Sequence, residues 1–230
     1  VRGLQLISTI DVRLQEFAED LMEGKIGSVV AIEPATGEIL VMVSSPTYNP
    51  DELMGRDRGN NYMKMLENPQ RPLFNRAVMS SYPPGSTFKL VSAMALLDEG
   101  KPTSLKYNSE AGRRVQVGGR KGASVQDSHR ILQDDSPTLD MRYAFAESAN
   151  VYFTKAVFDA FESNPVEFSD YCRKLHLHKT VGLEYLGARK GVVPHLDKRH
   201  HSRYNALVNM AYGYNIDITP MHTLTMYNAI

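Results

Sequence analysis

Residues 83–89 read Pro-Pro-Gly-Ser-Thr-Phe-Lys, and both the fold and the chemistry of the chain can be worked out from this stretch. Pro-Pro-Gly ends any preceding regular structure and favours a tight turn, because proline fixes φ and glycine tolerates conformations that other residues avoid. The apolar periodicity that follows predicts a helix over Ser86–Glu99, ended by Gly100 and Pro102. The residues expected to face the core are Phe88, Val91, Ala95 and Leu96.

Ser86 and Lys89 form a candidate nucleophile and base. They are three residues apart, so they share one face of the predicted helix and the Lys89 amine can reach the Ser86 hydroxyl. A serine hydroxyl needs a base, and a lysine amine can act as one when burial or the positive end of a helix lowers its pKa. Gly85 would let a substrate approach the backbone closely. Taken alone, an N-capping serine in a chance Ser-x-x-Lys spacing is the commoner interpretation.

A second polar pair, Ser148 and Asn150, lies in the Ser-Ala-Asn sequence between helices predicted over Leu139–Ala146 and Val151–Phe161. A hydroxyl and an amide in such a break could relay a proton and hold a substrate amide beside a Ser/Lys pair. Helix capping is the simpler alternative, because serine and asparagine are both good N-caps.

The rest of the chain predicts an α+β fold. Two apolar runs, Ile26–Glu33 and Glu38–Ser44, flank a Pro-Ala-Thr-Gly turn and predict an antiparallel hairpin covered on both faces. The glycine-containing segment Lys106–Gln126 predicts short strands and turns, with a hairpin turn at residues 118–122. Further helices are expected over Leu14–Met22 with Asp11 as N-cap, Tyr62–Glu67, Pro165–Leu175 and Met221–Ile230, and Gly187–Arg203 is expected to be loop.

Composition excludes several classes of function. Lys and Arg together number 26, as do Asp and Glu, so the formal net charge is zero and no nucleic-acid partner is expected. The one cysteine, Cys172, excludes an internal disulfide and is predicted to be a packed residue, since no base lies near it in sequence. The 7 histidines lack the spacing of a metal site, so neither a metal nor a cofactor is expected. The basic run at residues 198–203 is predicted to be a solvated loop, with anionic glycan or lipid headgroups as the alternative.

The motifs at 83–89 and 148–150, in this order, resemble those of the transpeptidase domain of class B penicillin-binding proteins. Residues 6–15, 29–40 and 212–220 also resemble segments of that domain, so the resemblance covers essentially the whole chain. It implies a fold like that of serine β-lactamases, with an antiparallel sheet flanked by helices beside an all-helical subdomain, and the active cleft between them. Residues 1–230 would form part of this domain, with residues 26–44 as its first hairpin and residues 86–220 as a mostly helical subdomain carrying the motifs.

The resemblance also implies a mechanism. Ser86 would attack the D-Ala–D-Ala carbonyl of a peptidoglycan stem peptide, while Lys89 takes the hydroxyl proton. Ser148 would relay a proton to the leaving amine, and Asn150 would hold the substrate backbone and position Lys89. A neighbouring stem amine would resolve the acyl-enzyme, whereas a β-lactam would leave Ser86 acylated. The backbone amide of Ser86, next to Gly85, would be one oxyanion donor.

Two features depart from the family's pattern. Its third motif, Lys-Thr-Gly or Lys-Ser-Gly, is not found; residues 179–182 read Lys-Thr-Val-Gly but fall in an expected loop. The subtype signal is divided, since residues 72–77 resemble elongation-type enzymes while residues 127–129, 164–168, 211–214 and 227–230 resemble division-type enzymes. Both ends of the chain read as cut, so we expect the strands that carry the third motif, and the second oxyanion donor, to follow Ile230.

The same resemblance implies partners and a location. They are the stem peptide, β-lactams, a glycosyltransferase in an elongation or division complex, and the periplasmic face of the bacterial inner membrane, with an N-terminal transmembrane anchor outside these residues. A β-lactam-sensing receptor domain and a non-catalytic scaffold are the alternative functions. Because one oxyanion donor would be missing, residues 1–230 alone are expected to show little turnover and at best slow acylation.

Overall fold

The computed structural model describes residues 7–182 and 187–230, so Leu6, at the start of the segment 6–15 noted above, lies outside the described residues. The chain divides into two compact units. The first consists of Val1–Ser81, Thr180–Arg189 and Thr219–Ile230, and the second of Tyr82–Lys179 and Lys190–Ile218. Residues that are distant in sequence are therefore brought together within each unit.

The first unit contains the predicted hairpin. Strand β1 (Gly27–Ile32) pairs antiparallel with β2 (Ile39–Ser45), with Val29 opposite Val43. The predicted strands are confirmed, and each of their four ends differs by one residue from the prediction. The other elements of the unit are α1 (Val12–Leu21), a 3₁₀ turn at Pro50–Leu53, α2 (Arg58–Glu67), α3 (Arg76–Met79) and α9 (Pro220–Asn228).

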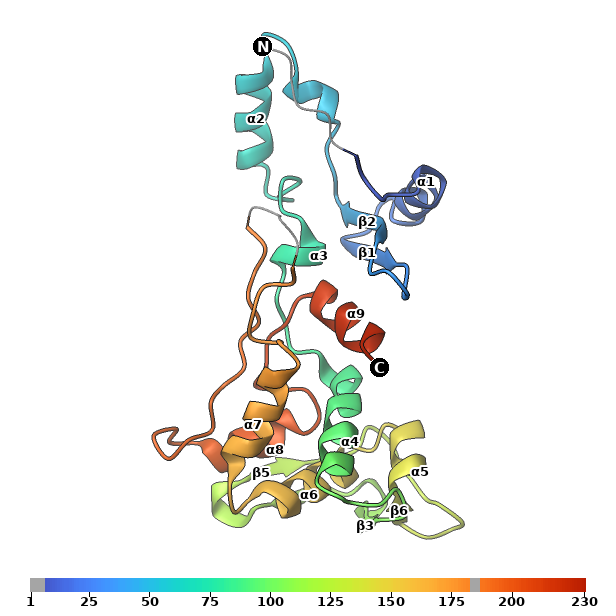
Figure 1. The fold of residues 1–230 in the computed structure, drawn as a ribbon, viewed down its shortest axis with the longest axis vertical. Helices are drawn as coiled ribbons and strands as arrows, with labels where there is room; N and C mark the ends of the chain where they lie inside the picture. The colour runs from blue at the N-terminus through green and yellow to red at the C-terminus, as the bar shows by residue number, and fades with distance from the viewer. Residues whose placement is uncertain (1–6, 183–186) are drawn as a thin grey trace. The chain divides into compact units, whose positions relative to one another are not determined.

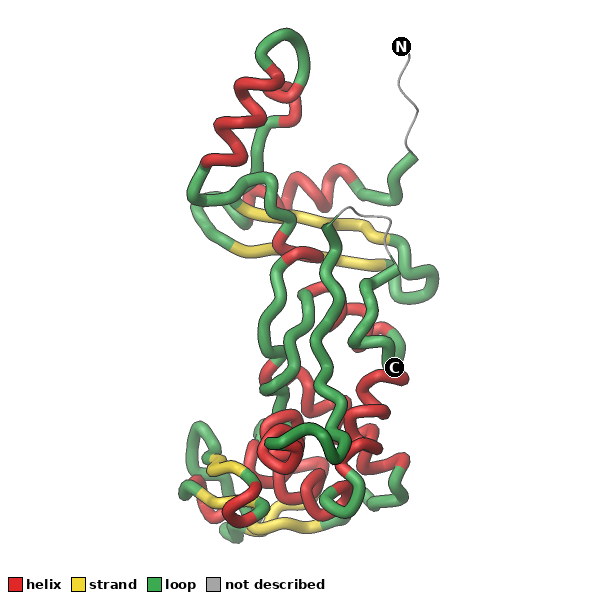
Figure 2. Tube along the Cα trace, turned by 90° about the vertical axis from the view of Figure 1, so that its left-hand side faces the viewer, coloured by secondary structure: helices red, strands yellow, loops and turns green. Residues whose placement is uncertain are grey.

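Helices cover both faces of this hairpin, as its apolar strands predict. Side chains alternate across a strand, so Val41 and Val43 point to one face, where they pack with Ala18 of α1. Val30 and Met42 point to the other face and pack around Val78 and its neighbours from α3 and α9. Figures 1 and 2 show α1 and α3 on opposite sides of the two strands. The predicted N-cap of α1 is also confirmed, because the Asp11 carboxylate accepts from the backbone N–H of Arg13 at 2.9 Å.

The second unit is mostly helical and is built around α6 (Asn150–Phe161), which packs against each of the other helices of the unit. These helices are α4 (Lys89–Asp98), α5 (Met141–Ala146), α7 (Pro165–Lys174) and α8 (Arg203–Met210). Two small antiparallel sheets complete it: β3 (Lys106–Asn108) with β6 (Thr138–Asp140), and β4 (Val115–Val117) with β5 (Ala123–Val125). The unit is therefore not all-helical; β3, β4 and β5 fall within the segment Lys106–Gln126 where short strands and turns were predicted, whereas β6 lies outside it.

The core of this unit contains the residues expected on the helix after the Pro-Pro-Gly turn. Phe88, Val91 and Leu96 have no exposed surface, and Ala95 is 1% exposed. Cys172 on α7 is also fully buried. Burying these apolar side chains fixes the rotation of α4 and hence the direction in which Lys89 points.

Three details of the predicted secondary structure are wrong. Residues 85–88 form a 3₁₀ turn, a common beginning of an α-helix, and α4 itself begins only at Lys89. Leu139 belongs to strand β6, and α5 starts after Asp140, whose carboxylate caps it. Helix α8 was missed, because asparagines at positions 205 and 209 weaken its helical signal and packing of its buried face decides it.

None of the helices in the described part of the chain is long and apolar enough to pass through a bilayer.

Candidate active site

The turn before α4 places Ser86 at the protein surface. Gly85 donates its backbone N–H to the carbonyl of Gly213 at 3.0 Å, and the Ser92 hydroxyl one turn into α4 donates to the carbonyl of Ala211 at 2.8 Å. The segment 211–213 therefore fixes both the turn and the helix that follows it. A side-chain carbon at Gly85 would meet nothing within 4 Å, so the space in front of this residue is open.

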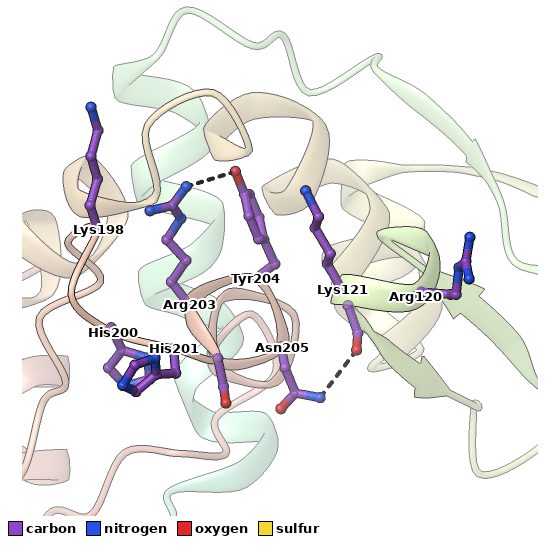
Figure 3. A pocket seen from close by; sticks show the side chains of 10 residues that line it. Arg120, Lys121, Lys198, His200, His201, Arg203, Tyr204 and Asn205 are labelled. Atoms are coloured by element: carbon purple, nitrogen blue, oxygen red, sulfur yellow. Dashed lines mark hydrogen bonds between the residues drawn. The ribbon is translucent and has the colours of Figure 1, made fainter.

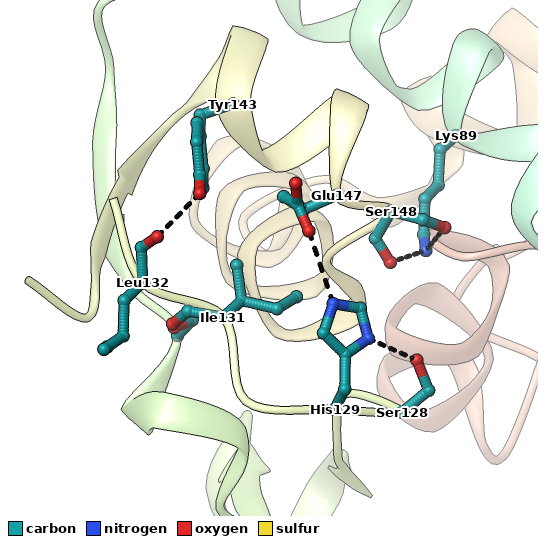
Figure 4. A network of polar contacts seen from close by, with 9 residues as sticks. Lys89, Ser128, His129, Ile131, Leu132, Tyr143, Glu147 and Ser148 are labelled. Atoms are coloured by element: carbon teal, nitrogen blue, oxygen red, sulfur yellow. Dashed lines mark hydrogen bonds and ion pairs between the residues drawn. The ribbon is translucent and has the colours of Figure 1, made fainter. Parts of the chain in front are cut away.

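Ser86, Lys89 and Ser148 converge in the second unit. The Lys89 ammonium nitrogen Nζ lies 3.1 Å from Ser86 Oγ and 2.8 Å from Ser148 Oγ, and it also donates to the backbone carbonyl of Ser148. Figure 4 shows the side chain of Lys89, the first residue of α4, pointing at Ser148. Ser86 and Ser148 are exposed, whereas Lys89 is only 1% exposed, so a buried amine joins two hydroxyls that a substrate can reach.

The environment of Lys89 suits a base. Burial lowers the pKa of Lys89 from 10.5 to about 8, because desolvation disfavours the charged ammonium; the negative charge of Asp127 acts in the opposite direction. A neutral amine has two N–H donors and one lone pair. With both donors directed at Ser148, the lone pair is left to accept the proton of the Ser86 hydroxyl.

The backbone at Ser148 explains how its two oxygen atoms reach Lys89. Ser148 has a φ of +56°, in the left-handed region. Its N–H donates to the Phe145 carbonyl at 3.1 Å, and the N–H of Ala149 donates to the Ala144 carbonyl at 2.8 Å. This pair of bonds is the Schellman motif that ends a helix, with Ser148 in the position usually occupied by glycine. Ser148 thus terminates α5 through its backbone, and its side chain is left for Lys89.

Asn150 stands apart from this cluster. It is the first residue of α6, and its side-chain amide donates to the backbone carbonyl of Gln126 at 3.0 Å. The Lys89 amine makes its hydrogen bonds with Ser86 and Ser148. The expectation that Asn150 positions Lys89 is therefore not supported by a direct contact. The role of Asn150 in holding a substrate stays a prediction, as does that of the Ser86 amide as an oxyanion donor.

Asp127 is a neighbour of this site that sequence reasoning did not select. It is 4% exposed, and its Oδ1 accepts from the backbone N–H of Val151 at 3.0 Å. Burial raises the pKa of Asp127, while backbone N–H groups of Val151 and Asn150 and the charges of Lys89 and His129 act to lower it. An aspartate in a run of polar residues gives no sign of burial, so only the tertiary structure reveals it.

The residues after Asp127 tie the same segment to the end of α5. The His129 ring lies 3.3 Å from the Glu147 carboxylate through Nε2 and 3.0 Å from the Ser128 hydroxyl through Nδ1. Figure 4 shows this chain of contacts next to the pair formed by Lys89 and Ser148. Glu147 directly precedes Ser148, so the segment 126–129 is fastened on both sides of the Ser-Ala-Asn motif.

The other candidate groups considered in the sequence do not add to this site. Burial raises the pKa of the Cys172 thiol well above its usual range, which leaves it a packed, unreactive side chain. Within the described residues, no cluster of three or more His, Cys, Asp or Glu side chains could hold a metal ion. Residues 179–182 lie in no strand, so the Lys-Thr-Val-Gly sequence there is not the family's third motif, as the sequence indicated.

A nucleophilic hydroxyl beside a buried, readily deprotonated lysine defines the class of enzymes that transfer acyl groups through a serine ester. Comparison with known families agrees with this class. The model of the penicillin-binding protein transpeptidase domain matches residues 27–230, and the chain belongs to this family.

Curated relatives lie within the same family. The chain is 35% identical over 169 residues to the peptidoglycan D,D-transpeptidase PbpA of Mycolicibacterium smegmatis. This match covers 67% of this chain and 32% of that protein. It is 37% identical over 192 residues to the peptidoglycan D,D-transpeptidase MrdA of Escherichia coli K12, covering 84% of this chain and 29% of the relative. The chain thus spans about a third of the length of the curated relatives it matches.

Solved structures show the same fold. Penicillin-binding protein A from Mycobacterium tuberculosis, as its penicillin G acyl-enzyme complex, superposes with a TM-score of 0.81 at 27% identity, over 96% of this chain and 51% of that one. Penicillin-binding protein 2 of Pseudomonas aeruginosa gives a TM-score of 0.80 at 25% identity, over 96% of this chain and 50% of that one. The predicted α+β fold of penicillin-binding proteins and the class B resemblance are both confirmed.

Proposed function

We propose that the protein containing this chain is a peptidoglycan D,D-transpeptidase that acts through an acyl-enzyme on Ser86 and is inhibited by β-lactams. The observation that carries this proposal is the position of the buried Lys89 amine, 3.1 Å from Ser86 Oγ and 2.8 Å from Ser148 Oγ. Further support comes from relatives that carry the name peptidoglycan D,D-transpeptidase and from a structural neighbour acylated by penicillin G.

The proposed reaction runs in two stages. In the first, Lys89 accepts the proton of the Ser86 hydroxyl, and Oγ forms an ester bond to the carbonyl carbon between the two D-alanines. The C–N bond breaks, the proton passes through Ser148 to the leaving amine, and D-alanine departs. In the second stage, the amine of a neighbouring stem peptide attacks the ester, forms the cross-link and returns the proton to Ser86.

The remaining groups complete the site in this proposal. Asn150 holds the backbone of the stem peptide, and the open space in front of Gly85 admits the scissile carbonyl next to the Ser86 amide. The protein works at the periplasmic face of the bacterial inner membrane, where peptidoglycan is assembled, together with a glycosyltransferase that supplies the glycan chains. The location and the glycosyltransferase partner are what the family resemblance implies.

Labelling with a fluorescent penicillin tests the first stage. The complete protein should gain the mass of one penicillin, Ser86→Ala should gain none, and Ser124→Ala should behave like the wild type, because Ser124 is an exposed serine on β5. Labelling of Ser86→Ala at the wild-type rate would contradict the proposal.

Assay of stem-peptide cross-linking tests the second stage. A transpeptidase releases D-alanine from a D-Ala–D-Ala stem peptide and joins two stems. Acylation by penicillin without any cross-linking would point to a β-lactam sensor instead, and absence of acylation would point to a non-catalytic scaffold.

A further inference from the structure

The start of helix α6 lacks a capping side chain of its own. Its N-cap residue is Ala149, which has no oxygen in its side chain and is fully buried. Helices usually receive this cap from a serine, threonine, aspartate or asparagine at that position. Here the Asp127 carboxylate, from a different part of the chain, accepts from the N–H of Val151, the second residue of α6. The cap is therefore supplied across the fold.

The other oxygen of this carboxylate has no hydrogen-bond partner. Among the described residues, Asp127 Oδ2 is buried and unpaired. An unpaired, buried carboxylate oxygen is costly unless it has an electrostatic role. The groups that interact electrostatically with Asp127 are Lys89 of α4 and His129, whose ring lies 3.3 Å from the Glu147 carboxylate at the end of α5. Lys89 and Asp127 thus interact electrostatically, and the negative charge of Asp127 favours the ammonium form of Lys89.

We propose that Asp127 is a positioning residue that fixes the Ser148–Asn150 segment by capping α6 and serves as the counter-charge of Lys89. The cap holds the backbone around residue 150, so the carbonyl and hydroxyl of Ser148 keep their places on the Lys89 amine. The counter-charge limits how far burial reduces the proton affinity of Lys89. This inference rests on the proposed function, since the acylation of Ser86 reports it.

Asp127→Asn separates the two roles, because the amide oxygen keeps the cap while the charge is lost. Since Asp127 raises the pKa of Lys89, we expect the pH midpoint of penicillin acylation to move to lower pH in this variant. Asp127→Ala loses the cap as well, and we expect acylation to slow by about ten- to a hundredfold. Asp140→Asn, which alters the cap of α5 in the same way, should leave the pH midpoint unchanged.

Wild-type acylation in the same assay distinguishes failure of this inference from failure of the proposed function. If the wild type is acylated and the pH profile of Asp127→Asn superposes on its profile, the counter-charge role is wrong. If Asp127→Ala is acylated at the wild-type rate, the capping role is wrong. Asp127→Ser, a short uncharged cap, provides the same pH measurement if the asparagine variant does not fold by circular dichroism.

A basic pocket in the same unit carries a second, independent inference. It has a volume of about 550 Å³ and is lined by Arg120, Lys121, Gly122, Lys198, His200, His201, Ser202, Arg203, Tyr204 and Asn205. None of these residues is acidic, although the chain as a whole is neutral. Figure 3 shows Lys121 and Arg203 on either side of Tyr204, with Lys198 further away beyond Arg203.

Two nitrogen atoms of this pocket lack partners. Among the described residues, Arg203 Nε and His200 Nδ1 are buried without a hydrogen bond. The Arg203 guanidinium lies 4.9 Å from the centre of the Tyr204 ring and donates to the Tyr204 hydroxyl at 3.2 Å, so it is held in place with an N–H to spare. The planar N–H donors of a guanidinium match a phosphate group, and Lys121 and Lys198 add positive charge to the same pocket. We infer that this pocket binds a phosphate group, either of a free anion or of a lipid headgroup.

Titration with inorganic pyrophosphate at low salt, followed by calorimetry, tests this inference, and sedimentation with vesicles of phosphatidylglycerol or of phosphatidylcholine distinguishes the two sources. We expect Arg203→Gln, and separately Lys121→Gln with Lys198→Gln, to weaken binding at least about tenfold. Arg114→Gln with Lys174→Gln removes two exposed charges elsewhere in the unit and should have little effect. The inference would be overturned if neither pyrophosphate nor phosphatidylglycerol vesicles bind. It would also be overturned if the pocket variants and the control variant lose affinity equally.

Discussion

Lys89 Nζ and the hydroxyl of Ser148 lie 2.8 Å apart, although 59 residues separate them in the chain. Their contact joins the first turn of α4 to the end of α5. It also gives the buried Lys89 amine a polar partner other than Ser86, so the amine can donate to one serine while it accepts a proton from the other. The chemistry proposed for this protein depends on that geometry.

Replacing the base should stop acylation. Lys89→Arg keeps a positive charge but removes a group that can lose its proton near neutral pH, so we expect penicillin acylation to fall by about 10²- to 10⁴-fold. Lys174→Arg, on an exposed position of α7, should have no effect. Rates are measured with a fluorescent penicillin on variants that retain the wild-type circular dichroism spectrum. Acylation of Lys89→Arg at the wild-type rate would show that Lys89 is not the base.

The rate of acylation should depend on pH through Lys89. Burial lowers the pKa of this amine to about 8, and only the neutral form can accept the Ser86 proton. The neutral fraction grows as pH rises, so the rate should increase about tenfold per pH unit below this value and level off above it. Stopped-flow measurement of acylation, corrected for spontaneous hydrolysis of the β-lactam, gives the midpoint. A rate that is the same on both sides of about pH 8 would be incompatible with this role.

Two substitutions at Ser148 should separate its hydroxyl from its backbone. Both Ser148→Ala and Ser148→Gly remove the hydroxyl, so both should slow acylation by a similar factor of about 10²-fold. The φ of +56° favours glycine, so the glycine variant should be more stable to urea than the alanine variant by about 1 kcal/mol. If either variant is acylated as fast as the wild type, the proton relay does not pass through Ser148.

The close approach of Gly213 to the turn that carries Ser86 should not tolerate a side chain. A Cβ at Gly213 would lie 2.0 Å from the Gly85 carbonyl oxygen, whereas one at Gly100 would meet nothing within 4 Å. Both glycines have positive φ, +87° and +73°, so alanine at either position carries a backbone cost of about 1–3 kcal/mol.

In addition to this backbone cost, the new methyl group of Gly213→Ala should displace the turn that carries Ser86, whereas that of Gly100→Ala should displace nothing. We therefore expect it to unfold at lower urea concentration than Gly100→Ala and, unlike Gly100→Ala, to slow acylation by at least about tenfold. Identical acylation rates for the two variants would mean that the contact between Gly213 and Gly85 does not position Ser86.

Local patterns in the sequence were sufficient for the elements whose structure depends on neighbours along the chain. The hairpin of β1 and β2 was predicted because alternation and a Pro/Gly turn are short-range signals. The proximity of Ser86 and Lys89 was predicted for the same reason, since a spacing of three residues brings side chains together in either an α-helix or a 3₁₀ turn. The buried face of α4 followed from helical periodicity alone.

Features that depend on distant contacts were not predictable in this way. Helix α8 has a weak helical sequence, and it is stabilised by burial of Ala206, Leu207, Val208 and Met210. The capping of α6 by Asp127 depends on a contact across 24 residues, and no local pattern marks that aspartate as buried. The start of α4 was misplaced because the hydrogen bond from Gly85 to Gly213 holds the turn out of the helix.

The sequence by itself determined the family and the proximity of the proposed nucleophile, Ser86, to the proposed base, Lys89, because these two residues are neighbours in a fixed local geometry. The tertiary structure decided which groups surround this pair: it brought Ser148 to Lys89, turned Asn150 toward Gln126 and buried the Asp127 carboxylate at the start of α6. The physical reason is that desolvation and charge pairing act through space. The lowered pKa of Lys89 therefore depends on residues that approach it only when the chain has folded.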